Sequence, residues 1–144
     1  MKNILVAVDF EEKTRLLLDY AADLAKKFDS KIWIVHISMP EPDFVGYGIG
    51  PQYIRNSRAE ELVEEHQLVQ HYAQDVIKEG IEAEGLLIQG PTVKMILDEA
   101  KKLSIELIVI GSHEHSFLYN AFLGNTTSDL IRKSKIPILV IHID

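Results

Sequence analysis

The strongest constraint on the fold is a regular alternation of short apolar runs with longer segments of helical spacing. Each run is nearly continuous in Ile, Leu and Val, which is typical of a parallel strand buried on both faces. The predicted strands are residues 3–9, 31–38, 83–89, 106–111 and 137–143. Apolar residues recur every three or four positions in the intervening segments, as on one face of a helix. The predicted helices contain residues 17–28, 62–77, 93–103 and 126–134.

This alternation predicts a single α/β domain. Parallel strands joined through helices require right-handed crossovers, which place helices on both faces of the sheet. A chain of 144 residues, 47% of them apolar, is long enough for one core without disulfides or a structural metal. We therefore expect residues 1–144 to form one doubly wound, five-stranded parallel sheet of the Rossmann-like type.

Several local signals set the expected helix boundaries. Ser57 and Glu60 match a capping box, which would start the second helix at Ser57, and Gly80 is suited to its left-handed end. Thr92 is placed to cap the third helix. Between the second strand and the second helix, residues 39–56 contain three prolines and three glycines. A loop this long is either a functional lid or a tolerated insertion, and the sequence leaves both open.

Charge and composition exclude several classes of function. With 15 basic and 22 acidic residues the net charge is 15 − 22 = −7, and no basic cluster suits a phosphate backbone, so we expect no nucleic-acid partner. The chain has no cysteine, which excludes disulfides, thiolate metal sites and thiol catalysis. No apolar stretch approaches the roughly 18 residues of a membrane span, and the N-terminus lacks a leader pattern. We therefore expect a cytoplasmic protein.

Open parallel sheets bind ligands beyond the carboxyl ends of their strands, where the strand order reverses. This rule selects a few residues as candidates for a small-molecule site. They are Asp9 and Phe10, Ile37 and Ser38, Gln89 and Gly90, and the segment from Gly111 to His115. Asp9 has a second interpretation, because an Asp after a strand often caps the next helix.

The segment from Ile110 to Thr127 resembles the loop of the universal stress protein family. ATP-binding members carry Gly-x2-Gly-x9-Gly-[Ser/Thr] between the fourth strand and the last helix, and Gly111 and Gly124 match its first and third glycines. The resemblance spans the whole chain. It includes the opening Ile-Leu-x-x-x-Asp-Phe, His36-Ile37 at the end of the second strand, Gly90-Pro91 after the third, and Ser134-Lys135-Ile136-Pro137 before the last.

The resemblance implies ATP or another adenine nucleotide as ligand, with or without Mg²⁺. It places Asp9 and Ile37 at the adenosine half, has Ile110, Gly111 and His113 line the pocket, and assigns the phosphates to Gly124, Asn125 and Thr126. Two positions depart from the motif, since Glu114 replaces the second glycine and Asn125 the Ser/Thr. A carboxylate about 5 Å from a phosphate would oppose binding by about 3 kcal/mol at an effective dielectric near 20. We therefore expect a weakened phosphate half, partly compensated by the amide of Asn125 and the hydroxyl of Thr126.

Other chemistries fit the residues less well. The third strand ends in Gln89-Gly90 without the phospho-accepting Asp of a receiver domain, and the fifth ends in His142-Ile143-Asp144 without its Lys. The chain also lacks G-x4-G-K-[S/T] and G-x-S-x-G. No nucleophile with its base can be identified, so we expect no catalytic residues and no efficient enzyme, although slow ATP hydrolysis stays open. His113 and His115 flank Glu114, but two imidazoles and one carboxylate in a loop do not predict a metal site.

The last strand bears on partners. From Ile138 to Ile143 it is apolar on both faces and is expected at a sheet edge, where it could pair with another chain. Family members commonly form two-fold dimers through this strand, so the resemblance implies a homodimer. Two functions follow: a stress-response regulator that binds an adenine nucleotide and an unidentified protein partner, or an interaction protein with an empty pocket that acts through association alone.

Overall fold

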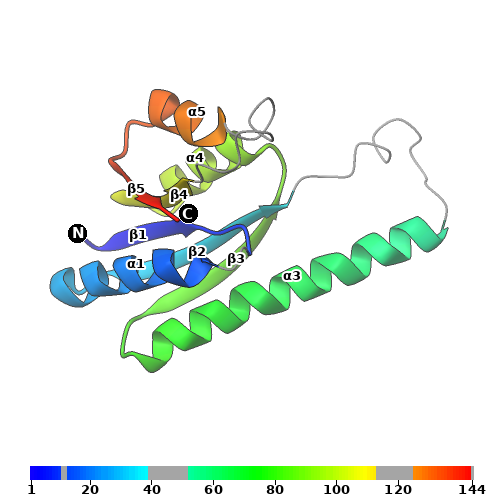
Figure 1. Ribbon diagram of the computed structural model, residues 1–144, viewed down its shortest axis with the longest axis horizontal. Coiled ribbons are helices and arrows are strands. Elements are labelled where there is room, and N and C mark those ends of the chain that lie inside the picture. Colours follow the sequence, from blue (N-terminus) through cyan, green and yellow to red (C-terminus); the bar gives the residue numbers. More distant parts are fainter. Residues whose placement is uncertain (11–12, 39–51, 113–124, 144) are drawn as a thin grey trace.

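The computed structural model describes residues 1–10, 13–38, 52–112 and 125–143. For residues 52–58 and Asn125 it describes the backbone only. In chain order the elements are β1 (Asn3–Ala7), α1 (Thr14–Phe28), β2 (Lys31–Ser38), α3 (Gln52–Lys78), β3 (Ala83–Gln89), α4 (Thr92–Lys102), β4 (Leu107–Ser112), α5 (Asn125–Lys133) and β5 (Ile138–His142) (Figure 1).

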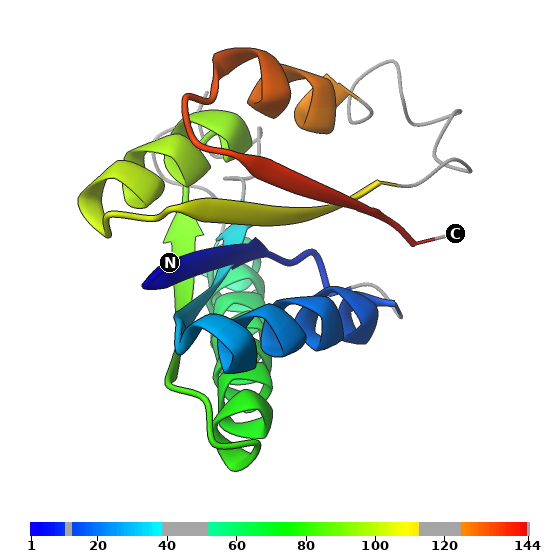
Figure 2. The same ribbon diagram turned by 90° about the vertical axis from the view of Figure 1, so that its left-hand side faces the viewer.

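The five strands form one parallel sheet in the order β3-β2-β1-β4-β5. The predicted doubly wound sheet is therefore confirmed, and β5 lies at an edge as expected. Helices α1 and α3 cover one face and α4 and α5 cover the other (Figure 2). The strands supply side chains to both layers: Ile4 and Ile34 pack under α1 and α3, whereas Leu5 packs under α4 and α5.

Two predicted helix starts are wrong. Helix α3 begins at Gln52, so Ser57 lies inside it and cannot be its N-cap, and residues 52–56 belong to α3 rather than to the predicted loop. Residues 39–51 of that loop lie outside the described residues. Helix α4 takes Pro91 as its N-cap and Thr92 as its first residue. Gly80 has the left-handed conformation expected after α3, with φ +86°.

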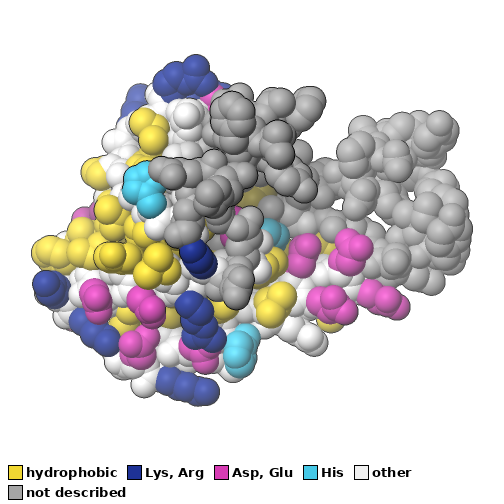
Figure 3. All heavy atoms as spheres, viewed as in Figure 1, with side chains coloured by type: hydrophobic (Ala, Val, Ile, Leu, Met, Phe, Trp, Pro, Cys, Tyr) yellow, Lys and Arg dark blue, Asp and Glu magenta, His cyan; other side chains and the backbone are white. Residues whose placement is uncertain are grey.

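Helix α3 is longer than the sheet it covers. Among its described side chains, which begin at Ala59, the first fully buried one is Val69, and Figure 1 shows the preceding turns extending past the sheet. Acidic side chains gather on this extension in Figure 3, and Glu60, Glu61 and Glu64 are exposed there. This surface would repel a phosphate backbone. None of the helices in the described part of the chain has the length and apolarity required to cross a bilayer.

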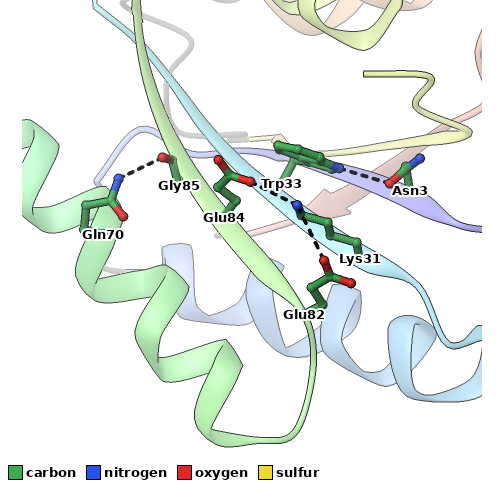
Figure 4. Close-up of polar contacts among 7 residues, drawn as sticks. All are labelled: Asn3, Lys31, Trp33, Gln70, Glu82, Glu84 and Gly85. Atoms are coloured by element: carbon green, nitrogen blue, oxygen red, sulfur yellow. Dashed lines mark hydrogen bonds and ion pairs between the residues drawn. The ribbon is translucent and has the colours of Figure 1, made fainter. Parts of the chain in front are cut away.

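Polar contacts join the amino-terminal parts of β1, β2 and β3 (Figure 4). Lys31 Nζ lies 3.0 Å from Glu84 Oε2 and 3.8 Å from the centre of the Trp33 ring. Trp33 Nε1 donates to Asn3 Oδ1 at 3.1 Å. The long side chains of β2 thus connect its neighbours on both sides at this end of the sheet.

Helix α3 approaches the edge strand β3 at a glycine. A Cβ on Gly85 would lie 2.6 Å from Val69 Cγ1 and 2.7 Å from Val69 O. Beside this contact, Gln70 Nε2 donates to the Gly85 carbonyl at 2.8 Å (Figure 4). A backbone oxygen this close leaves no room for any side chain at position 85.

Gly85→Ala is therefore expected to push α3 off β3 and to lower the free energy of unfolding by about 2 kcal/mol. The comparison variant is Gly80→Ala, which meets no atom within 4 Å but must adopt a positive φ. It should cost about 1 kcal/mol from backbone strain alone. Chemical denaturation measures both, and a Gly85→Ala protein as stable as the wild type would contradict the close packing of α3.

Candidate functional site

The strand order creates one switch point, between β1 and β4. From β1 the chain proceeds outward through β2 to β3, then returns across the sheet to β4 and continues to β5. Ligands in such sheets bind at the carboxyl ends of the strands beside this point. The adjacent strand ends are those of β1, β4 and β2.

The candidate residues of the adenosine half lie on these neighbouring strands. Asp9 is exposed and follows Val8, whose N–H donates to Val35 O at 2.9 Å. Ile37 is buried near the end of β2, and Ile110 is buried near the end of β4. Because β1 pairs with both β2 and β4, the sheet brings these three positions to one edge.

The alternative interpretation of Asp9 as a helix cap is wrong. Helix α1 begins at Thr14 with Lys13 as its N-cap. Asp9 therefore belongs to the turn that leaves β1 and not to the helix that follows.

The phosphate half is described only in part. Helix α5 starts at Asn125 and places Thr126 half-buried in its first turn. Because α5 connects two parallel strands, its N-terminus lies at the carboxyl-end edge of the sheet, where its free N–H groups favour an anion. His113 and Gly124, like Glu114, lie outside the described residues.

Gly111 has a structural reason to be glycine. Its φ is not positive, but a Cβ there would lie 2.6 Å from Ile143 Cδ1 and 3.4 Å from Leu17 Cδ2. The glycine lets the C-terminal segment and α1 pack against the end of β4. This requirement is independent of any phosphate, and it adds a packing role to the one that the resemblance implies.

Sequence reasoning missed a polar and aromatic cluster beside Asp9. His36 Nδ1 lies 2.8 Å from the Val8 carbonyl oxygen, and the ring of Phe10 lies 4.1 Å from the His36 ring between centroids. Phe10 has φ +63°, which is rare for a residue with a side chain. The available signal was a single histidine in the otherwise apolar run from Ile32 to Ile37.

One carboxylate near this cluster has a shifted pKa. Arg15 Nη2 donates to Asp75 Oδ2 at 2.5 Å, and this hydrogen bond holds the pKa of Asp75 below its ordinary value. The pair joins α1 to α3 across their outer sides. In the part of the chain that the structure describes, no three His, Asp or Glu side chains are arranged to hold a metal ion.

Comparison with known proteins shows which family the chain resembles. The model of the universal stress protein family matches residues 1–142. Universal stress protein YxiE of Bacillus subtilis is 27% identical over 144 residues, covering 96% of this chain and 97% of that protein.

Two solved structures share the fold. One is the universal stress protein from Archaeoglobus fulgidus in complex with dAMP, with a TM-score of 0.69 at 24% identity, covering 100% of this chain and 98% of that one. The other is a universal stress protein family protein from Arabidopsis thaliana with AMP bound, with a TM-score of 0.71 at 15% identity, covering 100% and 93%.

The packing of Gly111 predicts energetic coupling to Ile143. Gly111→Ala should lower the free energy of unfolding by about 1–2 kcal/mol, because the new methyl group meets Ile143 Cδ1. Ile143→Val removes that atom at a cost of about 1 kcal/mol. The double variant should therefore lose less stability than the sum of the single losses in chemical denaturation. Strictly additive losses would show that the two side chains do not meet.

Proposed function

The chain belongs to the universal stress protein family, and we propose that it is a small cytoplasmic stress-response regulator that binds an adenine nucleotide at the carboxyl ends of β1, β2 and β4. Nucleotide occupancy would then control its association with a protein partner. The ligand is ATP or another adenine nucleotide, with or without Mg²⁺.

The observation that carries this proposal is that Asp9, Ile37 and Ile110 lie at the carboxyl ends of neighbouring strands, beside the switch point of the sheet. An exposed carboxylate beside two buried aliphatic side chains suits a ligand with an apolar ring and a hydroxylated sugar. The relatives from Archaeoglobus and Arabidopsis, which hold dAMP and AMP, support an adenine nucleotide.

The phosphate half is the weaker part of the proposed site. Glu114 places a negative charge in the motif, while α5 contributes its N-terminal N–H groups and the hydroxyl of Thr126. A monophosphate or a nucleoside meets less of this repulsion than a triphosphate does. We therefore propose AMP or adenosine as ligands that retain more affinity than ATP.

We propose a binding role and not an efficient catalytic one. Asp9 is an ionisable side chain at the described strand ends, and the sequence around the strand-end serines Ser38 and Ser112 lacks the G-x-S-x-G elbow of a serine nucleophile. Slow hydrolysis of bound ATP remains compatible with this arrangement.

Calorimetric titration with AMP and ATP tests the site. We expect Glu114→Gly to raise ATP affinity by up to about a hundredfold while changing AMP affinity less, because AMP loses less affinity than ATP to the carboxylate. Glu114→Gln is the matched control, because it removes the charge and keeps the side chain. If neither nucleotide binds at millimolar concentration, the site is empty and the association-only function replaces the one proposed here.

The second part of the proposal is a homodimer formed through β5. Its hydrogen-bonding directions support such an interface: Ile108 N–H donates to Pro137 O at 3.0 Å, and Ile143 N–H donates to Ser112 O at 3.1 Å. The backbone N–H and C=O groups of successive residues point alternately to the two sides of a strand. The backbone groups of residues 137, 139, 141 and 143 therefore face β4. The backbone groups of Ile138, Val140 and His142 then face the open edge, where a second copy could pair.

Val140→Pro removes an outward N–H and leaves the β4–β5 ladder intact, so it should convert the proposed dimer to a folded monomer in sedimentation. Val140→Ala keeps the N–H and should remain dimeric. Leu139→Pro, by contrast, removes a donor that faces β4 and should unfold the edge. A folded Val140→Pro protein that is still a dimer would exclude this interface.

A further inference from the structure

We propose that His36 is a positioning residue for the nucleotide site: it holds the turn that presents Asp9. The inference rests on the proposed function, because it assigns a role to a residue that does not itself reach the ligand. His36 contacts the residues on both sides of Asp9, Val8 and Phe10.

The first contact is with the residue before Asp9. A carbonyl oxygen only accepts hydrogen bonds, so the 2.8 Å contact with Val8 O requires His36 Nδ1 to carry the proton and donate. The Val8 N–H donates a backbone hydrogen bond to Val35 O on β2. His36 therefore secures the chain to β2 with a side chain at the point where β1 has ended at Ala7.

The second contact is with the residue after Asp9. The φ of +63° at Phe10 is unfavourable for a side chain of this size and persists only where surrounding contacts determine it. The His36 ring lies 4.1 Å from the Phe10 ring, and the Tyr72 ring lies 6.3 Å from it on α3. Packing between these rings compensates for the backbone conformation.

Helix α3 supplies the other wall of the cluster. Tyr72 lies under the guanidinium of Arg15, which is 5.7 Å from its ring centre. Glu65 Oε2 lies 4.0 Å from His36 Nε2, and among the described residues this buried oxygen has no hydrogen-bond partner. The imidazole is therefore confined by β1, α3 and the turn, with its Nδ1 directed at Val8.

These contacts fix the backbone of Val8 and Phe10, and Asp9 lies between them. An Asp between two anchored neighbours has little freedom to change the direction of its side chain. Loss of the Nδ1 hydrogen bond should release the turn and reduce adenine-nucleotide affinity without unfolding the sheet, because Phe10 and Tyr72 are only partly buried at the margin of the core under α1 and α3.

The test compares His36→Asn with His36→Gln. Asn places an amide N–H near the position of Nδ1 and can still donate to Val8 O, whereas Gln places its amide one bond farther out, nearer Nε2. Both lose the ring, so the difference between them reports the hydrogen bond. In AMP titrations we expect His36→Gln to bind about tenfold more weakly than His36→Asn.

Two further measurements separate this role from a general loss of stability. The free energy of unfolding of each variant establishes that the titrated protein is folded. Amide NMR shifts of Asp9 and Phe10 in the ligand-free protein should move in both variants because the ring is lost, and should move less in His36→Asn than in His36→Gln. Equal affinities and equal shifts in the two variants would overturn the positioning role. If wild-type protein binds no AMP, the proposed function fails, and the NMR comparison still decides whether His36 holds the turn.

Discussion

The pairing of β1 with β4 is the contact on which the rest of the structure depends. It aligns Ile4, Leu5 and Val6 with Leu107, Ile108 and Val109, and it joins strands that are about a hundred residues apart in the chain. Through it the β1-β2-β3 half shares one sheet with the β4-β5 half. Each paired strand supplies alternate side chains to the two helical layers, so a single ladder supports both cores. The same pairing makes the switch point, and the candidate site is thus a direct product of the core.

The strands and the connectivity could be predicted because their signal is local. A continuous apolar run must be buried on both faces, and alternation with helices admits few topologies. Helix starts were less predictable. A Ser with a Glu three residues later also occurs inside a helix, as Ser57 and Glu60 do in α3. Propensity and spacing cannot distinguish that case from a true capping box, because exposed residues such as Glu60, Glu61 and Glu64 carry no apolar periodicity that would show the helix continuing toward its N-terminus.

The candidate site was predictable at the level of strand ends and not at the level of its supports. Asp9, Ile37 and Gly111 follow from the rule for parallel sheets. The contact of Gly111 with Ile143 and that of His36 with Val8 join residues 28 or more positions apart. They depend on register and on a positive φ at Phe10 that no residue type signals. The candidate residues of the two halves of the proposed site therefore differ in origin: Asp9, Ile37 and Ile110 lie at the strand ends of the sheet, whereas Thr126 lies in the first turn of α5.

The hydrogen bond from Gln70 to Gly85 hinders the addition of another strand beside β3. It occupies an outward-facing carbonyl at the centre of β3, while α3 lies against the same strand. A strand that approached this edge would have to displace the Gln70 side chain before it could form its own ladder. At the opposite edge, β5 offers its outward groups to a neighbour. In the proposed homodimer, a sheet that can be extended only at β5 would add a single copy and then terminate, which would guard the chain against fibrous polymerisation.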